Sequence, residues 1–512
     1  MAKYEIKDGM GIIPEGMKAI GGVGFECAFE NSETLTSVII PNSVTEIGYY
    51  TFADCISLTN IVIPDSVTEI GNSAFKRCTG LTSIVIPDSV TEIRGGTFFG
   101  CTGLTSIVIP DSVTEIGDEA FKGCTALKNI TIPDSVTKIG NHAFSGCANL
   151  TSIVIPSSVT KIGSFAFENC PRLKSIIVSK DNKVYDSREN CNAIIDTEKN
   201  ALEVGCINTV IPSSVVGISM GAFWGSGLTS IVIPATVSWI NRGVFSGSKN
   251  LKSIVVEEGN PKYNSQGNCN AIIDRDNWLT EGCATTVIPE SVVLIGEEAF
   301  KNCTGLTTIV IPKSVREIRE YAFRGCTGLT SIVIPASVTK IDKYAFEGSR
   351  LTKIVVEEGN PTYDSRNDCN AIIETAENRL MLGFANSTIP DTVIEIGKQA
   401  FYERKGLTDI IIPKSVKTIE GDAFWGCTDL KSVSILGPVK KLEETFSRCS
   451  ALETVTLGVG IKTIKENAFN FCTSLKTIYV PAKKADYYKE RLPENLHGLI
   501  VEMPVEKKAK KK

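Results

Sequence analysis

Apolar and polar residues alternate in short runs along most of the chain. In the stretch LTSIVIP, residues 104–110, Leu104, Ile107 and Ile109 fall on one side of an extended backbone and Val108 on the other. This spacing predicts a short β-strand with one buried face. Pro110 ends the strand, because proline lacks the amide hydrogen that a continuing ladder needs.

Two further apolar steps follow before the pattern starts again. Val113 and Ile116 form the second step, and Ala120, Phe121 and Cys124 form the third. The first leucine of the pattern recurs every 23 residues, at positions 35, 58, 81, 104, 127, 150 and 173. A fixed period of this length predicts a solenoid, in which each coil has three inward-facing sides that only its neighbours can seal.

Three longer gaps of 55, 55 and 56 residues interrupt the leucine spacing. They contain similar segments, which begin at Tyr185, Tyr263 and Tyr363 and share the letters CNAII. Each segment holds two short apolar runs around a polar turn, so each predicts a long coil of about 32 residues with a β-hairpin. Together with the ordinary coils, these give about nineteen coils in a mainly β chain.

The ordinary coil resembles a leucine-rich repeat. It resembles the BspA-like subfamily more closely, on the pattern IPxSVTxIGxxAFxxC, and the resemblance extends from about Ile12 to Val501. The resemblance implies a right-handed, elongated solenoid with a parallel sheet on one face. It also implies surface or adhesive roles, which several bacterial and protozoan members have.

The resemblance further implies a cap after the last coil. We expect a short helix near residues 485–492 and a last strand near 499–501. The chain is accordingly divided into an N-terminal segment with the first coil (1–32), a BspA-like leucine-rich repeat array (33–480), a C-terminal cap (481–502) and a disordered lysine-rich tail (503–512).

Charge and hydropathy exclude some classes of function. The net charge is −5, but five lysines lie in the last ten residues, and the remainder has 48 basic and 57 acidic residues. An acidic body argues against a nucleic-acid groove. No run of 18 apolar residues occurs, so membrane insertion is not expected. Without a signal-peptide pattern the chain as written is expected to be cytoplasmic; the alternative is a cell-surface or secreted location, if a signal was removed or export is non-standard.

Eleven of the seventeen cysteines share one column of the repeat. The column consists of Cys55, Cys78, Cys101, Cys124, Cys147, Cys170, Cys303, Cys326, Cys427, Cys449 and Cys472, and other coils have Ser32, Ser226, Ser248, Ser349 or Arg404 there. A site shared by cysteine and serine favours reduced packing thiols, with disulfides between adjacent coils as the alternative. No metal site is predicted, because there is no C-x-x-C pair and there are only two histidines.

The chain carries no recognised catalytic pattern. It lacks a phosphate-binding loop, a nucleophile elbow and an HExxH motif. Its carboxylates recur as ladders of like residues, as at Glu46, Glu69, Glu92 and Glu115, whereas acid–base catalysis needs two groups in different environments. We therefore expect no enzyme and no cofactor, and a solvated edge at this ladder.

The outward residue of the main strand is apolar in most coils. Such residues favour any pleated surface, so this column has a purely structural interpretation. Stacked together, however, the column exceeds the apolar patch that a typical monomer exposes. We predict a partner-binding face made of Val62, Val85, Val108, Val154, Val232, Val310 and Val333, with Trp239 and Trp278 as isolated aromatic contacts.

The sequence thus predicts a non-enzymatic protein-binding or adhesion scaffold. It would present an extended parallel sheet face, with three projecting hairpins, to a macromolecular partner. Through the family resemblance, a host protein or another cell-surface protein is the expected partner. A glycan-binding surface module is one alternative, although the four tryptophans form no row at sugar spacing. A structural spacer that self-associates through the valine face is the other.

Overall fold

The computed structural model describes residues 4–21, 28–342 and 344–504. It divides into two compact units: the first contains residues 1–275 and 281–285, and the second contains residues 276–280 and 286–512. Each unit is considered by itself below. Most of the tail predicted at residues 503–512 lies outside the described residues.

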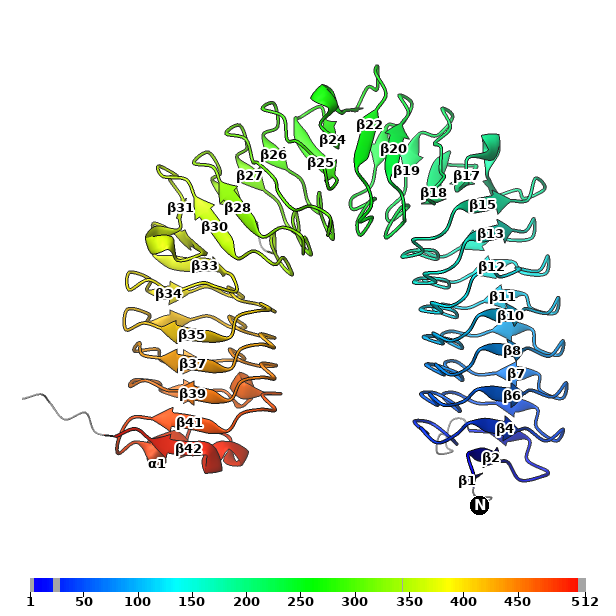
Figure 1. The fold of residues 1–512 in the computed structure, drawn as a ribbon, viewed down its shortest axis with the longest axis horizontal. Coiled ribbons are helices and arrows are strands. Elements are labelled where there is room, and N and C mark those ends of the chain that lie inside the picture. Colours follow the sequence, from blue (N-terminus) through cyan, green and yellow to red (C-terminus); the bar gives the residue numbers. More distant parts are fainter. Residues whose placement is uncertain (1–3, 22–27, 343, 505–512) are drawn as a thin grey trace, which may run out of the picture. The chain divides into compact units, whose positions relative to one another are not determined.

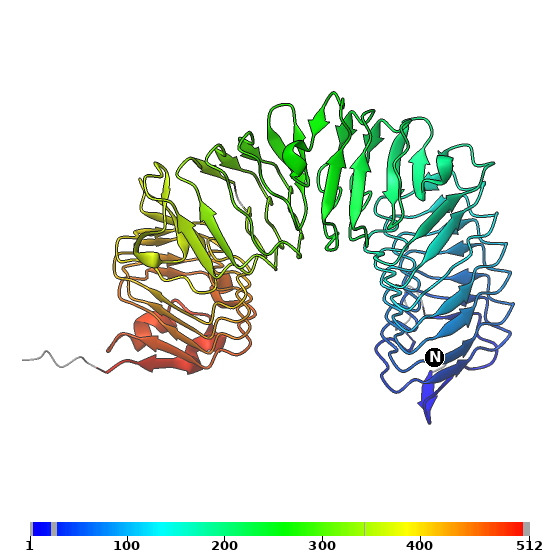
Figure 2. The same cartoon turned by 45° about the horizontal axis from the view of Figure 1, so that its top comes forward.

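In the first unit, ordinary coils stack on one another through their first strands (Figures 1 and 2). These strands pair in parallel and in register, so that Ile39 lies opposite Val62, and Val85 opposite Val108. They are β4 (Ser37–Ile39), β6 (Asn60–Val62), β8 (Ser83–Val85), β10 (Ser106–Val108), β13 (Ser152–Ile155) and β15 (Ser175–Val178). The predicted mainly β solenoid with a repeat of about 23 residues is confirmed.

A second ladder of two-residue strands forms the next side of each coil. Its members are β5 (Glu46–Ile47), β7 (Glu69–Ile70), β9 (Glu92–Ile93), β11 (Glu115–Ile116), β12 (Lys138–Ile139) and β14 (Lys161–Ile162). In each strand except β14 the isoleucine is buried, while the charged residue lies at the surface. The charged ladder seen in the sequence therefore follows the edge of this sheet.

The third side has no strand and is held by stacked phenylalanine rings. Along the first unit, neighbouring ring centroids lie 5.3 to 5.6 Å apart with interplanar angles of 6° to 13°. The stack contains Phe29, Phe52, Phe75, Phe98, Phe121, Phe144 and Phe167. Because each ring contacts the ring above and the ring below, no coil completes this core alone.

The cysteine column lies next to this stack. Its thiols donate to the carbonyl of a phenylalanine in the preceding coil, as from Cys101 Sγ to the Phe75 oxygen (3.0 Å). Ser248 makes the same contact through its hydroxyl, to the Phe223 oxygen at 2.6 Å. Cysteine and serine are both small and have a hydrogen to donate, which explains why serine can replace cysteine in this column. This agrees with the predicted packing role.

Each long coil builds its hairpin into the wall of the solenoid. In the first one, β16 (Tyr185–Asp186), β17 (Ala193–Asp196) and β18 (Ala201–Gly205) are antiparallel, and β18 then pairs in parallel with β19 (Gly217–Ile218). All four residues of β17 are buried. The expectation of a projecting hairpin is therefore wrong for this coil, because its first long strand replaces a side of the core.

An asparagine, buried in the first long coil and half-buried in the other two, fixes each long coil to the coil before it. The Asn182 amide donates to the carbonyls of Pro156 (2.8 Å) and Val159 (2.9 Å). Its oxygen accepts from the backbone of Val184 and Tyr185. Asn260 and Asn360 repeat this arrangement. The sequence analysis missed these residues, although each asparagine stands three positions before the tyrosine that marks its segment.

The second unit contains the same elements and ends in the predicted cap. Its main strands include β28 (Ser331–Ile334), β30 (Lys353–Val356), β35 (Asp409–Ile412), β37 (Ser432–Ile435), β39 (Thr454–Thr456) and β41 (Thr477–Val480). Helix α1 (Ala485–Lys489) and strand β42 (Ile500–Glu502) close the last coil (Figure 1). Tyr488, a residue of α1, is buried, and its hydroxyl donates to the Gly458 carbonyl at 2.5 Å.

Candidate binding surfaces

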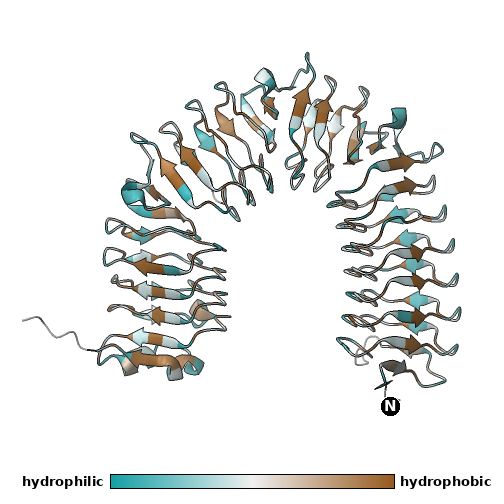
Figure 3. Cartoon of the chain, in the orientation of Figure 1, coloured by the Kyte–Doolittle hydropathy of each residue, from teal (hydrophilic) through white to brown (hydrophobic). Residues whose placement is uncertain are grey.

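The predicted valine column is exposed in both units. The seven valines range from 47% exposed at Val333 to 81% at Val310. In the first unit, the pairing places Val85 beside Val108, and Val232 beside Val255. The strands of the main ladder carry both apolar and polar residues (Figure 3). The seven valines thus lie at the surface, and their role in binding stays a prediction.

Polar residues run beside the valines on the same face. Ser83 and Ser106 are exposed, two positions before the valines of their strands, and they also lie in register. The Thr105 hydroxyl at the strand entrance donates to the Thr82 carbonyl of the preceding coil (3.1 Å). Strands β8 and β10 therefore each offer one hydroxyl and one branched apolar group, which keeps the face hydrated while leaving an apolar strip for contact.

The second unit has a depression on this face where the column loses its valines. Thr388 and Ser434 flank Ile411, which is 62% exposed. Around Ile411 lies an open hollow of about 850 Å³ that Asp409 and Lys414 also line. This hollow combines an exposed apolar side chain with both signs of charge.

The two predicted tryptophans do not join the valine column. Trp239 belongs to β21 (Trp239–Ile240), in the second ladder, and is half-buried. Its indole covers Gly217 of the preceding coil so closely that a Cβ there would lie 1.8 Å from Cε2. Trp278 is exposed, on β25 (Trp278–Gly282), where it pairs with Leu294. Trp239 is thus mainly a packing residue, and Trp278 presents more of its ring to solvent.

The acidic ladder at the second sheet is partly neutralised. Arg94 pairs with Glu69, and its Nε lies 3.7 Å from Glu92. Further along, Lys138 Nζ lies 2.9 Å from Glu115. These exposed pairs contribute at most about 1 kcal/mol each, but they reduce the repulsion between like charges. The ladder is a solvated edge, as the sequence predicted.

One cluster brings together a serine, a histidine and a glutamate. His142 Nδ1 lies 3.1 Å from Glu168 Oε1, and the imidazole stacks on the Phe165 ring at 5.4 Å. The Ser145 hydroxyl donates to the same carboxylate oxygen at 2.8 Å. A nucleophilic serine instead needs its hydroxyl directed at the imidazole. The cluster is therefore a partly buried hydrogen-bond network.

The column thiols are poor nucleophiles and poor metal ligands. Burial raises the pKa of Cys55 to about 11 and that of Cys101 to about 12. The reactive and metal-binding form of cysteine is the thiolate, which burial disfavours at neutral pH. Over the described ranges, no group of three His, Cys, Asp or Glu residues is arranged to hold a metal ion.

A partly open cavity in the second unit was not predicted. It lies beside the third long coil, has a volume of about 390 Å³, and is lined in part by Tyr344, Gln399 and Arg404. The sequence placed Arg404 in the cysteine column but gave no sign of a cavity there. Among the helices that the described residues form, none has the length and apolar character needed to cross a bilayer.

Comparison with known proteins gives the family. The model of the BspA type leucine-rich repeat region matches residues 12–127, 95–193, 203–270, 279–374 and 381–490. No curated protein matches the chain.

Several solved structures are similar. A leucine-rich cell surface protein of Faecalibacterium prausnitzii is 33% identical over 69% of this chain and 85% of its own, with a TM-score of 0.48. A leucine-rich repeat protein of Bacteroides ovatus is 24% identical over 86% of this chain and 88% of its own, with a TM-score of 0.30. The pneumococcal vaccine antigen PcpA is 17% identical over 98% of this chain and 97% of its own, with a TM-score of 0.31.

The family model covers well over half of the present chain. The chain therefore belongs to the BspA-type leucine-rich repeat family.

Proposed function

We propose that this protein is a non-enzymatic scaffold that binds a protein partner through its main sheet face, in an adhesive role. The observation that supports this most directly is the exposed valine column, which continues from coil to coil in register. A sheet already hydrogen-bonded along its ladder has few backbone groups to offer there, so contact with a partner would be made by side chains. An apolar strip between hydroxyl-bearing residues matches the composition of a non-obligate interface.

A cell-surface location is part of the proposal. The protein of Faecalibacterium prausnitzii that is 33% identical to this chain is a cell surface protein. A surface protein of the adhesive kind would meet a host protein or a protein on another cell, and this is the partner class we favour. The likeness supports the surface alternative over the cytoplasmic location expected from the sequence as written.

The experiment compares two triple variants that alter the same three strands. Val85→Lys, Val108→Lys and Val154→Lys together place three charges in the apolar strip. The matched control, Ser83→Lys, Ser106→Lys and Ser152→Lys, adds the same charges on the same face, two residues earlier in each strand. All six side chains are exposed, so both variants are expected to fold. Binding of labelled protein to cultured epithelial cells is measured by flow cytometry.

We expect saturable binding that the valine variant reduces by at least tenfold and the serine variant by less than threefold. Protease treatment of the cells should abolish binding, which identifies a protein partner. Loss of binding after periodate oxidation of cell-surface glycans, with protease-treated cells unaffected, would instead support the glycan-binding alternative. Equal loss in both variants, or no saturable binding at all, would contradict the proposal.

Self-association through the same face is tested separately by size-exclusion chromatography. A spacer that pairs valine face to valine face would elute as a dimer, and the valine variant would elute as a monomer. We expect the unmodified chain and both variants to elute alike, because the interspersed serines keep the face hydrated.

A further inference from the structure

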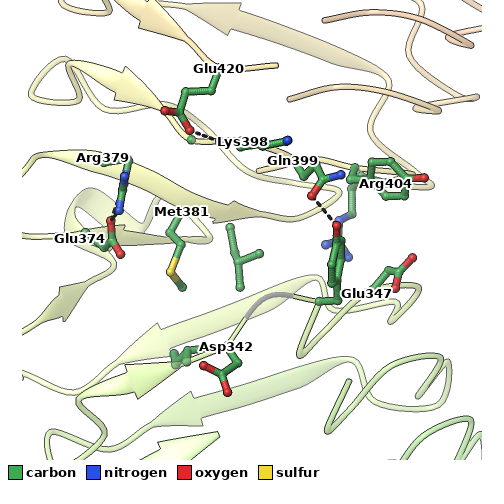
Figure 4. Close-up of a pocket in the computed structure, with 14 residues that line it drawn as sticks. Asp342, Glu347, Glu374, Arg379, Met381, Lys398, Gln399, Arg404 and Glu420 are labelled. Atoms are coloured by element: carbon green, nitrogen blue, oxygen red, sulfur yellow. Dashed lines mark hydrogen bonds and ion pairs between the residues drawn. The ribbon is translucent and has the colours of Figure 1, made fainter. Parts of the chain in front are cut away.

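The third long coil leaves a gap on the phenylalanine side of the solenoid. In the second unit the rings of Phe401, Phe424, Phe446 and Phe469 stack at 4.8 to 5.7 Å. Before them, Phe346 meets Phe384 of the long coil edge-on, with centroids 6.3 Å apart at 71°. The residues of the long coil form a hairpin, so this coil lacks the phenylalanine-bearing segment that would continue the ring stack. The cavity of about 390 Å³ occupies that level (Figure 4).

The first long coil has a similar cavity, of about 300 Å³, but it is lined by different side chains. There, Phe165 lies against Gly221, where a Cβ would come within 2.4 Å of the ring. The corresponding residues of the third long coil are Tyr344 and Gln399, which bond to each other at 2.6 Å. Ser226 stands where the third has Arg404, and Glu203 where the third has Met381. Of these two cavities, that of the third long coil is therefore the one that a buried arginine lines.

Arg404 is a buried cation without a matched anion. Its side chain is 5% exposed, and within the described part of the chain its Nε donates to no acceptor. Nη1 makes a long contact of 3.5 Å with the Ser349 carbonyl, and the guanidinium lies 4.8 Å from the Phe384 ring centroid. Burial lowers the pKa of Arg404 to about 10, so it stays charged at neutral pH. A buried charge in this state is costly unless an anion joins it.

The carboxylates around the cavity already have partners. Glu374 pairs with Arg379 at one end of the cavity, and Arg404 and Gln399 lie at the other, with Met381 between them (Figure 4). Glu347 accepts from Arg324 at 3.0 Å, and Glu420 accepts from the backbone amide of Lys398 at 2.7 Å. None of these acids lies within ion-pair distance of Arg404 among the described residues. Glu347 stabilises the Arg404 charge from beyond ion-pair distance, so what the guanidinium lacks is an anion in direct contact with it.

We propose that this cavity binds a small organic carboxylate, held by Arg404 and packed by its apolar part against Ile341, Met381 and Leu382. A carboxylate matches the Nε–Nη2 edge of a guanidinium in a planar, two-bond arrangement, and this is the edge that the Ser349 contact leaves available. The volume falls in the range of small-ligand sites. Nε is buried, so side chains that line the cavity must shift when the ligand reaches it.

The test is isothermal titration calorimetry on the full chain with acetate, butyrate and phosphate as probes. We expect butyrate to bind more tightly than acetate, and phosphate at least tenfold more weakly than butyrate. Arg404→Ser should weaken butyrate binding at least tenfold. Serine occupies the same column at Ser226 and Ser349, so this variant should fold. Arg172→Ser, at an exposed site in the first unit, makes the same chemical change and should leave binding unaltered.

A second variant tests the proposal even if Arg404→Ser fails to fold. Met381→Glu introduces the residue that the first long coil has at this place, and it sets a negative charge between the two ends of the cavity while leaving Arg404 intact. We expect it to abolish butyrate binding without lowering the thermal midpoint by more than a few degrees. Butyrate that fails to bind, binds equally to Arg404→Ser or Met381→Glu, or binds no better than phosphate would overturn the proposal.

Discussion

At the scale of single residues, the repeat selects side chains by the hydrogen bonds that they extend to the neighbouring coil. Ten of the eleven column cysteines show this, because their thiols donate to a phenylalanine carbonyl 25 or 26 residues earlier. A thiolate would lose that bond and would face the carbonyl oxygen instead. The neutral thiol is therefore part of the folded structure.

This gives stability a dependence on pH. An unfolded thiol has a pKa of about 8.5, and burial raises the pKa of Cys55 to about 11 and that of Cys101 to about 12. Between these values the unfolded chain has lost protons that the folded chain retains, so stability falls as pH rises. The contribution is complete below about pH 8.5 and falls by about 1.4 kcal/mol per pH unit for each such thiol.

The measurement is urea denaturation at pH 7.5, 9 and 10. We expect the free energy of unfolding to fall between pH 9 and 10, and to fall less in a variant with Cys101→Ser, Cys124→Ser and Cys147→Ser. Lysines and tyrosines titrate equally in both chains, so the difference isolates the thiols. Identical pH profiles for the two chains would show that these cysteines titrate normally.

Residue patterns predicted the two faces of the main strand but not every buried polar group. Ile107 and Val108 alternate, so their opposite exposures followed from the geometry of a strand. The burial of Asn182 and Arg404 could not be predicted in this way, because polar residues usually lie at the surface. Their burial depends on carbonyls or rings supplied by other coils, across the long-coil insertion. A pattern local to one coil carries no information about those partners.

At the scale of elements, the unit of stabilisation is the stack of like side chains. Phe98 is fully buried between Phe75 and Phe121, with centroids 5.6 and 5.5 Å away. Removing it would leave a cavity open to two neighbouring coils. Phe99, next in the chain, is half-exposed and packs near the amine of Lys76.

We expect Phe98→Ala to lower the free energy of unfolding by about 3–5 kcal/mol. Phe99→Ala should cost under about 1 kcal/mol, since it removes a surface ring and a weak cation–π contact. Urea denaturation followed by circular dichroism compares the two. Similar losses for both variants would mean that the buried stack is not what holds the third side together.

In the long coils, the sequence predicted the strands but not their place in the fold. A hairpin was expected from the two apolar runs at residues 193–196 and 201–205, and it formed. Its place in the wall was not foreseen, because the runs themselves do not reveal that β18 would join the second ladder through Ala201 and Leu202. The cavity beside the third long coil has the same origin, because there too a hairpin strand takes the place of an ordinary coil segment in the wall.

At the scale of the whole molecule, stability should spread from coil to coil and depend on closed ends. In the second unit, the cap covers the last coils through Tyr488, whose hydroxyl reaches Gly458. In a solenoid, loss of an end should loosen nearby coils first and leave distant ones intact.

Tyr488→Ala tests this by hydrogen exchange with mass spectrometry. We expect peptides from β39 and β41 to exchange at least tenfold faster, while peptides from β27 (Glu317–Ile318) in the same unit change little. Asp486→Ala, on the exposed side of α1, should leave all of them unchanged. Uniform acceleration across the unit would indicate that it unfolds as one cooperative block.

The asparagine and tyrosine that fix each long coil also limit how the gene for this chain can change length. Ordinary coils make equivalent bonds on both sides, so an in-frame gain or loss of 23 residues leaves every remaining coil with a suitable neighbour. A long coil is less interchangeable, because Tyr363 must find the Ile341 amide (3.1 Å) and Asn360 the carbonyls of Pro335 and Val338 in the coil before it. Unequal recombination should therefore vary the number of ordinary coils between the hairpins, while deletions that divide a hairpin from its preceding coil yield unstable products.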